Sequence, residues 1–253
     1  MNIINALVLG IIQGITEFLP ISSSGHLALI QNYIGEVNVG FDVVLHLATL
    51  LAIFVYFYKD LGLMIKDLFL WNKKSENFKM IWYIIFATIP IAVIGWFFRY
   101  FVYSLFENLY VVALGFFISG MFLFVASFSR AKNKLKLGNS FVIGISQAIA
   151  LIPGISRSGS TVSTGMLQGI EREKAIKFSF LLAIPAMIGA NILNFTDIKV
   201  VETWPFLVGF ITAFLFGLFA INVFMKWLKI KRFKWFAYYC WLMAMVALII
   251  SLV

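Results

Sequence analysis

The chain has 253 residues, of which 62% are hydrophobic and 12% are charged, and its formal net charge is +9. About a quarter of the residues of an ordinary soluble domain are charged, so this composition excludes a soluble globular protein and indicates one embedded in a membrane. The basic excess does not indicate a nucleic-acid partner, because the lysines and arginines lie in the connections between apolar segments, where loop charge sets membrane orientation.

The first 40 residues of the chain are apolar but interrupted. They begin MNIINALVLG, without the basic region or the small-residue cleavage site of a signal peptide, so we do not expect this segment to be removed. Proline, serine and glycine then interrupt the pattern at LPISSSG, residues 19–25, as in a turn rather than a continuous helix. The sequence therefore predicts two short helices joined by a break.

Six later segments are continuously apolar. They are 41–58, 80–98, 108–128, 178–196, 203–224 and 235–253. Each is close to the roughly 20 residues that a helix needs to cross a hydrocarbon core of about 30 Å. A large soluble all-α core would need charged outer faces on these helices, and they have none. We therefore predict six transmembrane helices; Cys240, in the last one, is the only cysteine, which excludes an internal disulfide and a cysteine-based metal site.

Basic residues are concentrated in three of the connections between the spans. These are 59–79, 129–138 and 225–234, whereas 99–107 and 197–202 hold one basic residue each. The positive-inside rule places the three rich connections in the cytoplasm and the other two outside. Segment 138–177 must then begin and end in the cytoplasm, so we predict that it is a re-entrant hairpin. Residues 1–40 must likewise return to the side from which they came, or else place the N-terminus across the membrane. Their interruption by proline, glycine and serine favours a hairpin, with Met1 and Val253 outside.

The two interrupted segments resemble each other. GIIQGITEFLPISSSG at 10–25 and GISQAIALIPGISRSG at 144–159 align without a gap, and the identical residues include a glutamine, two serines and two glycines. Each half then holds one hairpin and three spans, and because three is odd, the second half begins on the opposite face of the membrane. Broken helices at corresponding positions of such a repeat mark a site near the membrane midplane. We predict one all-α integral membrane domain over 1–253, with inverted-topology repeats at about 1–130 and 135–253.

Two polar side chains precede the first break. Gln13 and Glu17 are four residues apart, which places both on one face of a helix. Ionisable residues at membrane depth are usually functional, although Glu17 could be an interfacial carboxylate and Gln13 could serve helix–helix hydrogen bonding. Two such ligands are too few for a complete metal site, but they could share Mg²⁺ or Ca²⁺ with substrate phosphates. We therefore predict Gln13 and Glu17 as ligands of a divalent cation.

Three serines and a histidine follow this break. One of Ser22, Ser23 and Ser24 should cap the helix expected over residues 25–34, and the start of a helix attracts anions. His26, on the first turn, is either a buried hydrogen-bonded histidine or an acid–base catalyst. The neighbouring serines and glutamate favour the catalytic interpretation.

The second break, PGISRSGST at residues 153–161, contributes an arginine. The planar guanidinium of Arg157 suits phosphate oxygens, and it is costly within a membrane unless it is paired. The alternative is a structural ion pair between Arg157 and Glu17. Hydroxyl donors and a flexible backbone are also present, in Ser156, Ser158, Gly159 and Thr161. Together with the two helix starts and the groups of the first break, this set indicates phosphoryl transfer by positioning and charge neutralisation.

Both motifs resemble those of the undecaprenyl-diphosphate phosphatase family, also called the bacitracin-resistance family. QGITEFLPISSSGH is similar to the family's (E/Q)xxxE and SSxGH patterns, and PGISRSGST is similar to its PGxSRSxxT pattern. The resemblance covers essentially the whole chain, including its length, its pattern of spans and its internal repeat. Gln13 stands where many members have glutamate, and Ser24 where threonine is common.

The resemblance implies hydrolysis of undecaprenyl diphosphate to the monophosphate, which recycles the lipid carrier of bacterial cell-wall synthesis and confers bacitracin resistance. It also implies a divalent cation, the plasma membrane and an active site facing outside, and it allows a homodimer. The predicted roles are catalytic for Glu17, Ser23, His26 and Arg157; phosphate-binding for Ser22, Ser24, Gly25, Gly154, Ser156, Ser158 and Thr161; and cation-binding for Gln13 and Glu17.

A second interpretation is an inverted-repeat transporter or a lipid-carrier flippase, because broken helices in inverted repeats are typical of transporters. A transporter would need Arg157 and the helix starts to bind an anion, but no activated hydroxyl beside His26. The grouping of Ser23, His26 and Glu17 therefore favours the enzyme. Ser23, His26 and a water molecule are the three candidates for the nucleophile.

Overall fold

The computed structural model describes residues 1–35, 38–106, 108–195, 203–227 and 233–252. Within these ranges the chain forms twelve α-helices, and its only β-type pairing is an isolated bridge between Asn133 and Ile170. The prediction of an all-α protein is therefore confirmed. The predicted connection 197–202 and residues 228–232 of the third basic connection lie outside the described residues.

Six helices are long and apolar enough to cross a membrane, as predicted. They are α3 (Val39–Tyr56), α5 (Glu76–Phe97), α7 (Leu109–Ala126), α10 (Arg172–Leu193), α11 (Thr203–Trp227) and α12 (Phe233–Leu252). α5 and α10 begin several residues before the predicted spans, because polar residues continue each helix beyond its apolar part. Ser75, for example, accepts a hydrogen bond from the Asn77 N–H at 3.1 Å and so caps the start of α5. The chain is a multi-pass membrane protein.

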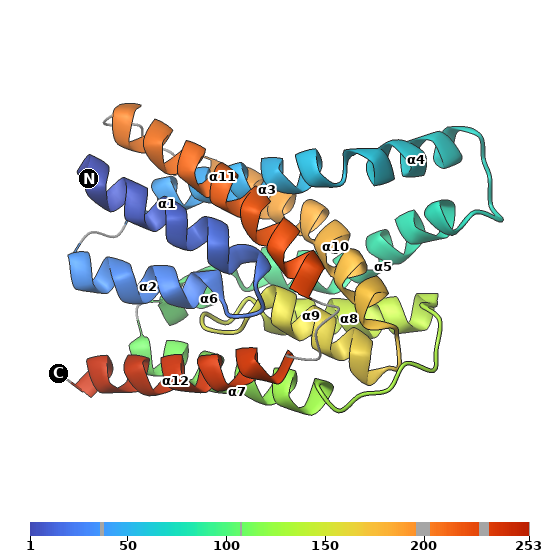
Figure 1. Cartoon of the computed structure of the whole chain (residues 1–253). Coiled ribbons are helices and arrows are strands. Elements are labelled where there is room, and N and C mark those ends of the chain that lie inside the picture. The colour runs from blue at the N-terminus through green and yellow to red at the C-terminus, as the bar shows by residue number, and fades with distance from the viewer. Residues whose placement is uncertain (36–37, 107, 196–202, 228–232, 253) are drawn as a thin grey trace.

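Four shorter helices form the two predicted hairpins. These are α1 (Ile3–Phe18) with α2 (Ser23–Ile34), and α8 (Leu137–Ile149) with α9 (Arg157–Leu167). The hairpins enter the bundle from opposite ends, and their bends meet near its centre (Figure 1). α1 packs along α11 and α8 packs along α5, so each hairpin rests on a long helix of the other half. Both interrupted segments are therefore helical hairpins, and the inverted relation of the complete halves stays a prediction.

Glycines let the first helix of each hairpin approach its neighbour closely. A Cβ atom on Gly10 of α1 would lie 2.0 Å from Thr212 Oγ1 of α11, and one on Gly144 of α8 would lie 2.3 Å from the Ala87 carbonyl oxygen of α5. Small residues at helix interfaces are a common means of close packing in membranes. This packing accounts for the glycine that recurs at the same position of both repeats.

Two further helices, α4 (Tyr58–Phe69) and α6 (Arg99–Phe106), lie in segments predicted as connections. α4 projects from one end of the bundle, as Figure 1 shows. It is tied to α10 by the ion pair of Asp60 with Lys177, whose charged atoms are 2.5 Å apart. The basic connection 59–79 is therefore partly helical.

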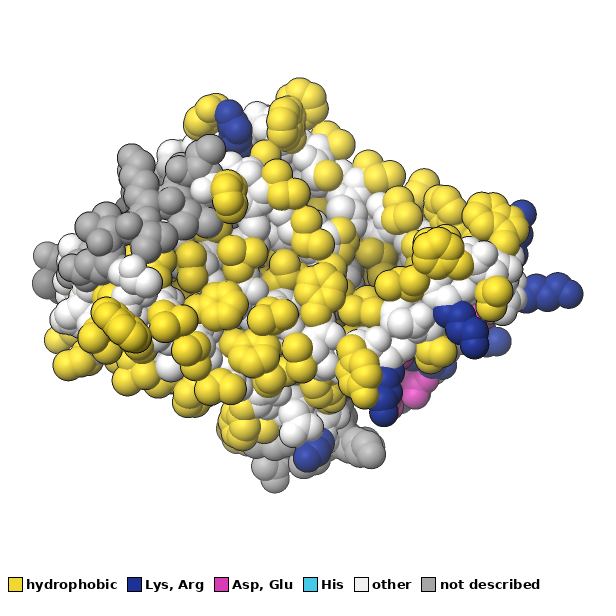
Figure 2. All heavy atoms as spheres, turned by 90° about the horizontal axis from the view of Figure 1, so that it is seen from above, with side chains coloured by type: hydrophobic (Ala, Val, Ile, Leu, Met, Phe, Trp, Pro, Cys, Tyr) yellow, Lys and Arg dark blue, Asp and Glu magenta, His cyan; other side chains and the backbone are white. Residues whose placement is uncertain are grey.

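Hydrophobic side chains cover the outside of the bundle as well as filling its core. Ile85, Leu114, Phe219 and Leu242, on four different spans, are between 47% and 60% exposed. In Figure 2 hydrophobic residues cover most of the visible face, while lysine and arginine gather towards the end from which α4 projects. Such an extended apolar surface is unfavourable in water and suits contact with lipid.

Candidate active site

The first break begins where α1 ends at Phe18, and α2 starts two residues earlier than predicted. Ser22 precedes α2 with a φ of 66°, an uncommon backbone conformation for a residue other than glycine. Its hydroxyl accepts a hydrogen bond from the Gly25 N–H at 3.2 Å. Ser22 is therefore the capping serine of the three. Ser23 and Ser24 are both partly exposed and lie on the first turn of α2.

The second break is held in place by α7. Gly154 has a φ of +85°, and a Cβ atom there would lie 2.2 Å from the carbonyl oxygen of Val112. The Ser119 hydroxyl donates to the Gly154 carbonyl at 3.1 Å and accepts from the Ser156 N–H at 2.8 Å. The Ser156 hydroxyl caps α9 by accepting from the Gly159 N–H at 3.0 Å. Glycine is therefore required at position 154, and Ser119 fixes the start of α9.

The two breaks lie against each other. A Cβ atom on Gly25 would lie 3.1 Å from the Gly154 Cα, and the Ser158 hydroxyl donates to the Leu19 carbonyl at 3.0 Å. α2 and α9 consequently begin close together, and the positive ends of both helix dipoles lie where the breaks meet. An anion placed there would be attracted by both helix starts.

Glu17, near the end of α1, is at the centre of the polar cluster. Its Oε2 atom accepts hydrogen bonds from Ser23 Oγ at 2.5 Å and from Gln13 Nε2 at 3.0 Å. Its Oε1 atom forms an ion pair with Arg157 Nη2 of the other hairpin. His46 Nε2 of α3 lies 3.8 Å from Oε2. Glu17 is only 6% exposed, and a buried carboxylate needs such partners to compensate its charge.

Three of the four predicted catalytic residues, Glu17, Ser23 and Arg157, are thus brought together. The ion pair that was the structural alternative for Arg157 is also present. It leaves the guanidinium able to bind a ligand, because among the described residues Arg157 makes side-chain hydrogen bonds through Nη2 alone. Nε and Nη1 remain as donors for a second partner such as a phosphate group.

His26, the fourth predicted catalytic residue, faces α12. Its Nδ1 atom lies 2.7 Å from the Ser22 carbonyl oxygen, and its Nε2 atom lies 2.8 Å from Tyr239 Oη. Phe116 packs edge-on against the ring with 5.2 Å between the centroids. Within the described residues His26 makes no hydrogen bond to the other catalytic candidates. Both ring nitrogens have partners in the surrounding helices, and a catalytic role for His26 stays a prediction.

The predicted phosphate-binding residues fall into three sets: four buried residues with hydroxyl groups, the partly exposed Ser24, and two glycines. The buried group is hydrogen-bonded within or between the hairpins and comprises Ser22, Ser156, Ser158 and Thr161. Ser24 is partly exposed, and its hydroxyl lies 3.2 Å from that of Ser22. Gly25 and Gly154 allow the close approach of the two backbones. The buried group would act on a ligand by orienting the N–H groups of the helix starts.

The predicted cation ligands suit a site shared with a substrate. Gln13 Oε1 is buried and has no hydrogen-bond partner among the described residues, whereas Nε2 of the same amide is bonded to Glu17. A buried acceptor without a partner is unfavourable, and a cation beside Glu17 would satisfy it. In the described ranges no group of three or more histidine, cysteine or acidic residues could hold a metal ion. A cation here would therefore need oxygen atoms from a ligand.

Four residues of the site were not singled out from the sequence. Asp42 and His46 interrupt the predicted span 41–58 with two ionisable side chains one turn apart, and that signal could have identified them. Ser119 and Tyr239 lie in spans without any comparable signal. Their roles become visible only because α7 packs against both hairpins and Tyr239 of α12 contacts His26.

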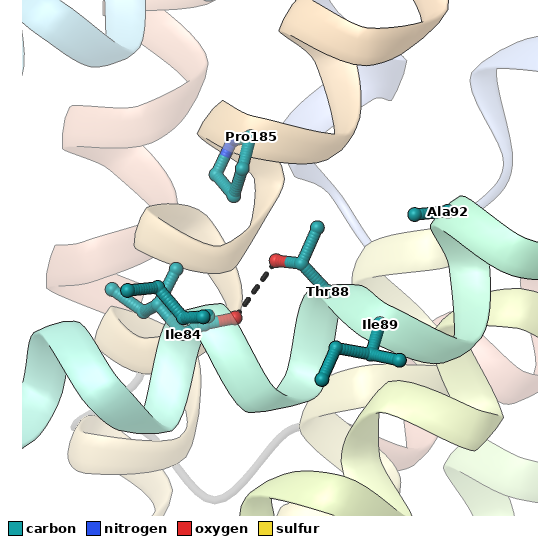
Figure 3. A pocket seen from close by; sticks show the side chains of 6 residues that line it. Ile84, Thr88, Ile89, Ala92 and Pro185 are labelled. Carbon is teal, nitrogen blue, oxygen red and sulfur yellow. Dashed lines mark hydrogen bonds between the residues drawn. The ribbon is translucent and has the colours of Figure 1, made fainter.

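An apolar groove of about 220 Å³ lies between α5 and α10. In Figure 3 it is lined by Ile84, Thr88 and Pro185, and the Thr88 hydroxyl donates to the Ile84 carbonyl at 2.7 Å. Pro185 is two residues from Met187, whose sulfur lies 3.6 Å from Arg157 Nη2. Side chains two positions apart on a helix point in different directions. The groove therefore lies on a different face of α10 from the polar cluster and presents no free polar group.

Comparison with known proteins agrees with the motifs. The chain matches the family model described as bacitracin resistance protein BacA over residues 6–246. It is 42% identical to the undecaprenyl-diphosphatase of Caldicellulosiruptor bescii, with 98% of this chain and 97% of that protein covered. It is 39% identical to the undecaprenyl-diphosphatase of Thermosipho africanus, with 98% of this chain and 100% of that protein covered. It is 38% identical to that of Methanobrevibacter smithii, with 97% of this chain and 96% of that protein covered. The chain belongs to the bacitracin resistance protein BacA family.

Proposed function

We propose that the protein is an integral membrane phosphatase that hydrolyses undecaprenyl diphosphate to undecaprenyl monophosphate and inorganic phosphate. The observation that carries this proposal is the contact of Ser23 and Arg157 with one buried carboxylate, Glu17, where the two hairpins meet. A hydroxyl, a base and a guanidinium in contact suit phosphoryl transfer. The full-length relatives named undecaprenyl-diphosphatase support it. The reaction would recycle the lipid carrier of cell-wall synthesis and confer bacitracin resistance.

Arg157 would change partners when the substrate arrives. In the structure its Nη2 atom is paired with Glu17, and the oxygens of a diphosphate would offer the guanidinium bidentate contacts. The Arg157 side chain is 17% exposed and that of Glu17 is 5% exposed, so the arginine is the more accessible member of the pair. Arg157 would then neutralise charge on the diphosphate, while Glu17 keeps its contact with Ser23.

Ser23 is the proposed nucleophile and Glu17 the proposed base. The Ser23 hydroxyl donates to Glu17 Oε2 at 2.5 Å. Ser23 Oγ would bond to the terminal phosphorus as its proton passes to Glu17 and the bond from that phosphorus to the bridging oxygen breaks. Water would then hydrolyse the phosphoserine. Direct attack by water and attack by His26 are the alternatives, and the second would require the His26 ring to leave its present partners.

Gln13 and Glu17 are the residues that would hold a divalent cation, Mg²⁺ or Ca²⁺, together with oxygens of the substrate. Such a cation supplies positive charge that stabilises phosphoryl oxygens. The supporting observation is the buried Gln13 Oε1 atom, which has no partner among the described residues and lies on the amide that bonds Glu17.

We place the protein in the bacterial plasma membrane, with the three basic connections in the cytoplasm and the active site facing outside. In Figure 1 the start of α1 and the end of α12 lie at one end of the bundle and α4 projects from the other, which supports this orientation. Val253 lies outside the described residues. The bilayer and a polyprenyl diphosphate are then the partners, and a homodimer stays an expectation.

Purified protein given undecaprenyl diphosphate as its only substrate provides the test. We expect one phosphate and one undecaprenyl monophosphate for each diphosphate consumed, with a requirement for Mg²⁺ or Ca²⁺. The transporter interpretation predicts instead that reconstituted protein moves the lipid across a vesicle membrane without releasing phosphate. That outcome would contradict the proposed function.

A further inference from the structure

The hydroxyl of Tyr239 on α12 belongs to neither hairpin, yet it is connected to the backbone that precedes Ser23. Tyr239 Oη lies 2.8 Å from His26 Nε2, and His26 Nδ1 lies 2.7 Å from the Ser22 carbonyl oxygen. We propose that Tyr239 is a positioning residue: through His26 it fixes the backbone before Ser23. This inference rests on the proposed function, in which Ser23 attacks the substrate.

The contacts of the His26 ring determine which atom donates in each hydrogen bond. The Ser22 carbonyl oxygen can only accept a hydrogen bond, so the nearby His26 Nδ1 carries a hydrogen. Nε2 of the neutral ring is then the acceptor, and the Tyr239 hydroxyl donates to it. The two rings also stack, with 5.7 Å between their centroids and 6° between their planes. A continuous set of hydrogen bonds therefore joins α12 to the first break.

Ser22 is the residue whose conformation these bonds hold. Its φ of 66° and ψ of 95° are uncommon for a residue other than glycine, and such a conformation persists only where the surroundings hold it. The Ser22 carbonyl oxygen accepts from the His26 backbone N–H at 3.3 Å as well as from the ring. The next residue is Ser23, whose hydroxyl donates to Glu17 Oε2 at 2.5 Å. A change in the Ser22 backbone would therefore move the Ser23 hydroxyl relative to Glu17.

α12 contacts the first break at two consecutive residues. Cys240, which follows Tyr239, is buried, and its Sγ atom donates to the Pro20 carbonyl oxygen at 3.7 Å. Trp241 then donates from Nε1 to the Phe117 carbonyl of α7 at 3.2 Å. α7 and α12 pack along each other (Figure 1), and α7 holds the second break by its own hydrogen bonds. The two helices thus form one support for both breaks, in which α12 holds the break that carries Ser23.

Tyr238, the neighbouring residue on α12, shows what a tyrosine does there when it only packs. It is 43% exposed, and its ring lies 5.9 Å from that of Trp241 and 6.3 Å from that of Phe124, measured between centroids. Within the described residues its hydroxyl makes no hydrogen bond. Tyr239 is similarly exposed, at 37%, but its hydroxyl is bonded to the buried His26. The hydroxyl of Tyr239, rather than its ring, therefore distinguishes the two tyrosines.

Tyr239→Phe removes this hydroxyl and keeps the ring that stacks on His26. We expect kcat for undecaprenyl diphosphate to fall by about 10-fold or more, because misplacing a reacting group by about 1 Å can cost about 10²-fold in rate. The dissociation constant of the methylene diphosphonate analogue, whose bridging carbon prevents hydrolysis, should not change. Tyr238→Phe is the matched control and should keep both values of the unmodified protein.

Hydrogen–deuterium exchange measures the positioning without any turnover. In Tyr239→Phe the backbone amides of residues 19–27 should exchange faster, because the first break opens more often, while those of residues 153–161 should not change. Ser119→Ala should give the opposite pattern, because the Ser119 hydroxyl bonds to the backbone of the second break.

Unchanged kcat in Tyr239→Phe, or unchanged exchange at residues 19–27, would overturn the proposal. An equal loss of activity in Tyr238→Phe, or faster exchange in both breaks, would overturn it as well, because either result would indicate a general loss of packing. Weaker binding of the analogue to Tyr239→Phe would place the hydroxyl against the substrate instead. Absence of phosphate release by the unmodified protein would refute the proposed function, and the exchange results would still decide whether Tyr239 holds the first break.

Discussion

The two hairpins can be compared position by position, because their breaks align without a gap. Ser22 and Ser156 are equivalent, and each caps the helix that follows it. At the next position the hairpins differ, since Ser23 corresponds to Arg157, and both of these side chains reach Glu17. The repeat therefore keeps the serine that caps the helix after each break and changes the next residue, which contacts Glu17.

Of the two hairpins, only the first contributes an acidic residue to the site. Gln13 and Gln147 are equivalent, but four residues later the first hairpin has Glu17 and the second has Leu151. Gln147 is fully buried, and within the described residues neither atom of its amide has a hydrogen-bond partner. Two related hairpins thus build one site with complementary groups rather than two equivalent sites. Several substitutions can test whether the two hairpins contribute different groups to one site.

Glu17→Gln should have the largest effect, because it removes the proposed base and the negative charge of the cation site together. We expect phosphate release to fall to background, and excess Mg²⁺ or Ca²⁺ should not restore it. Phosphate release from undecaprenyl diphosphate at increasing cation concentration measures this. Full activity in Glu17→Gln would remove Glu17 from the site.

Ser23→Ala tests the nucleophile. If Ser23 attacks, activity falls to background and no phosphoenzyme can be trapped; the neighbouring Ser24→Ala should lose much less. If water attacks directly, a residual rate persists in Ser23→Ala. A trapped phosphohistidine would instead identify His26 as the nucleophile.

Replacement of Arg157 by lysine or by alanine should each cause a large loss of activity. Loss of one preorganised charge at a transferring phosphoryl group costs about 10²–10³-fold in rate. Arg157→Lys should fail nearly as badly as Arg157→Ala, because a point charge cannot reproduce bidentate contacts. Measurement of kcat for both variants decides this, with thermal unfolding in detergent as the control for folding. Near-normal turnover in Arg157→Ala, Ser23→Ala and His26→Ala together would contradict the phosphatase mechanism.

Substitution of two glycines can distinguish the destabilisation caused by close packing from that caused by a positive φ alone. Gly154 and Gly35 both have positive φ, but a Cβ atom would lie 2.2 Å from a carbonyl oxygen at Gly154 and would have no neighbour within 4 Å at Gly35. Gly35→Ala should destabilise by about 1–2 kcal/mol, the usual left-handed penalty. Gly154→Ala should lower the unfolding midpoint clearly further. Equal unfolding midpoints for Gly35→Ala and Gly154→Ala would show that the backbone of the second break can shift to make room for a Cβ atom.

The equivalent glutamines provide the most direct comparison of the two hairpins. Gln13→Ala should raise the Mg²⁺ or Ca²⁺ concentration for half-maximal activity by about 10-fold or more, a loss typical of metal-site partners. Gln147→Ala is the matched control and should leave that concentration unchanged. An equal shift in both variants would argue against a cation held by Gln13.

Thiol labelling tests the orientation with little effect on activity. Cysteines placed singly by Lys74→Cys and Lys132→Cys, in a Cys240→Ala background, should resist impermeant thiol reagents in intact cells and react after the cells are opened. Cys240 is the only cysteine of the chain, so its replacement removes background labelling. Labelling of either cysteine in intact cells would reverse the proposed orientation.

The sequence alone predicted the six spans, both breaks and the serine caps, because hydropathy and turn chemistry are local properties of the chain. It also singled out Gln13, Glu17, Ser23 and Arg157 as candidates, because polar groups within apolar segments are usually functional. It did not identify Ser119, which joins the second break to α7 by two hydrogen bonds. A serine on a membrane helix has no pattern that distinguishes it.

The pairing of the polar groups was decided by tertiary structure. Glu17 meets Arg157 across 140 residues, and His26 meets Tyr239 across 213 residues. The first motif places His26 near Ser23 in sequence, yet His26 packs against α12, and His46 of α3 lies beside Glu17 instead. Local sequence determines which side chains occur at a break. How the helices pack determines which of them come within reach of one another.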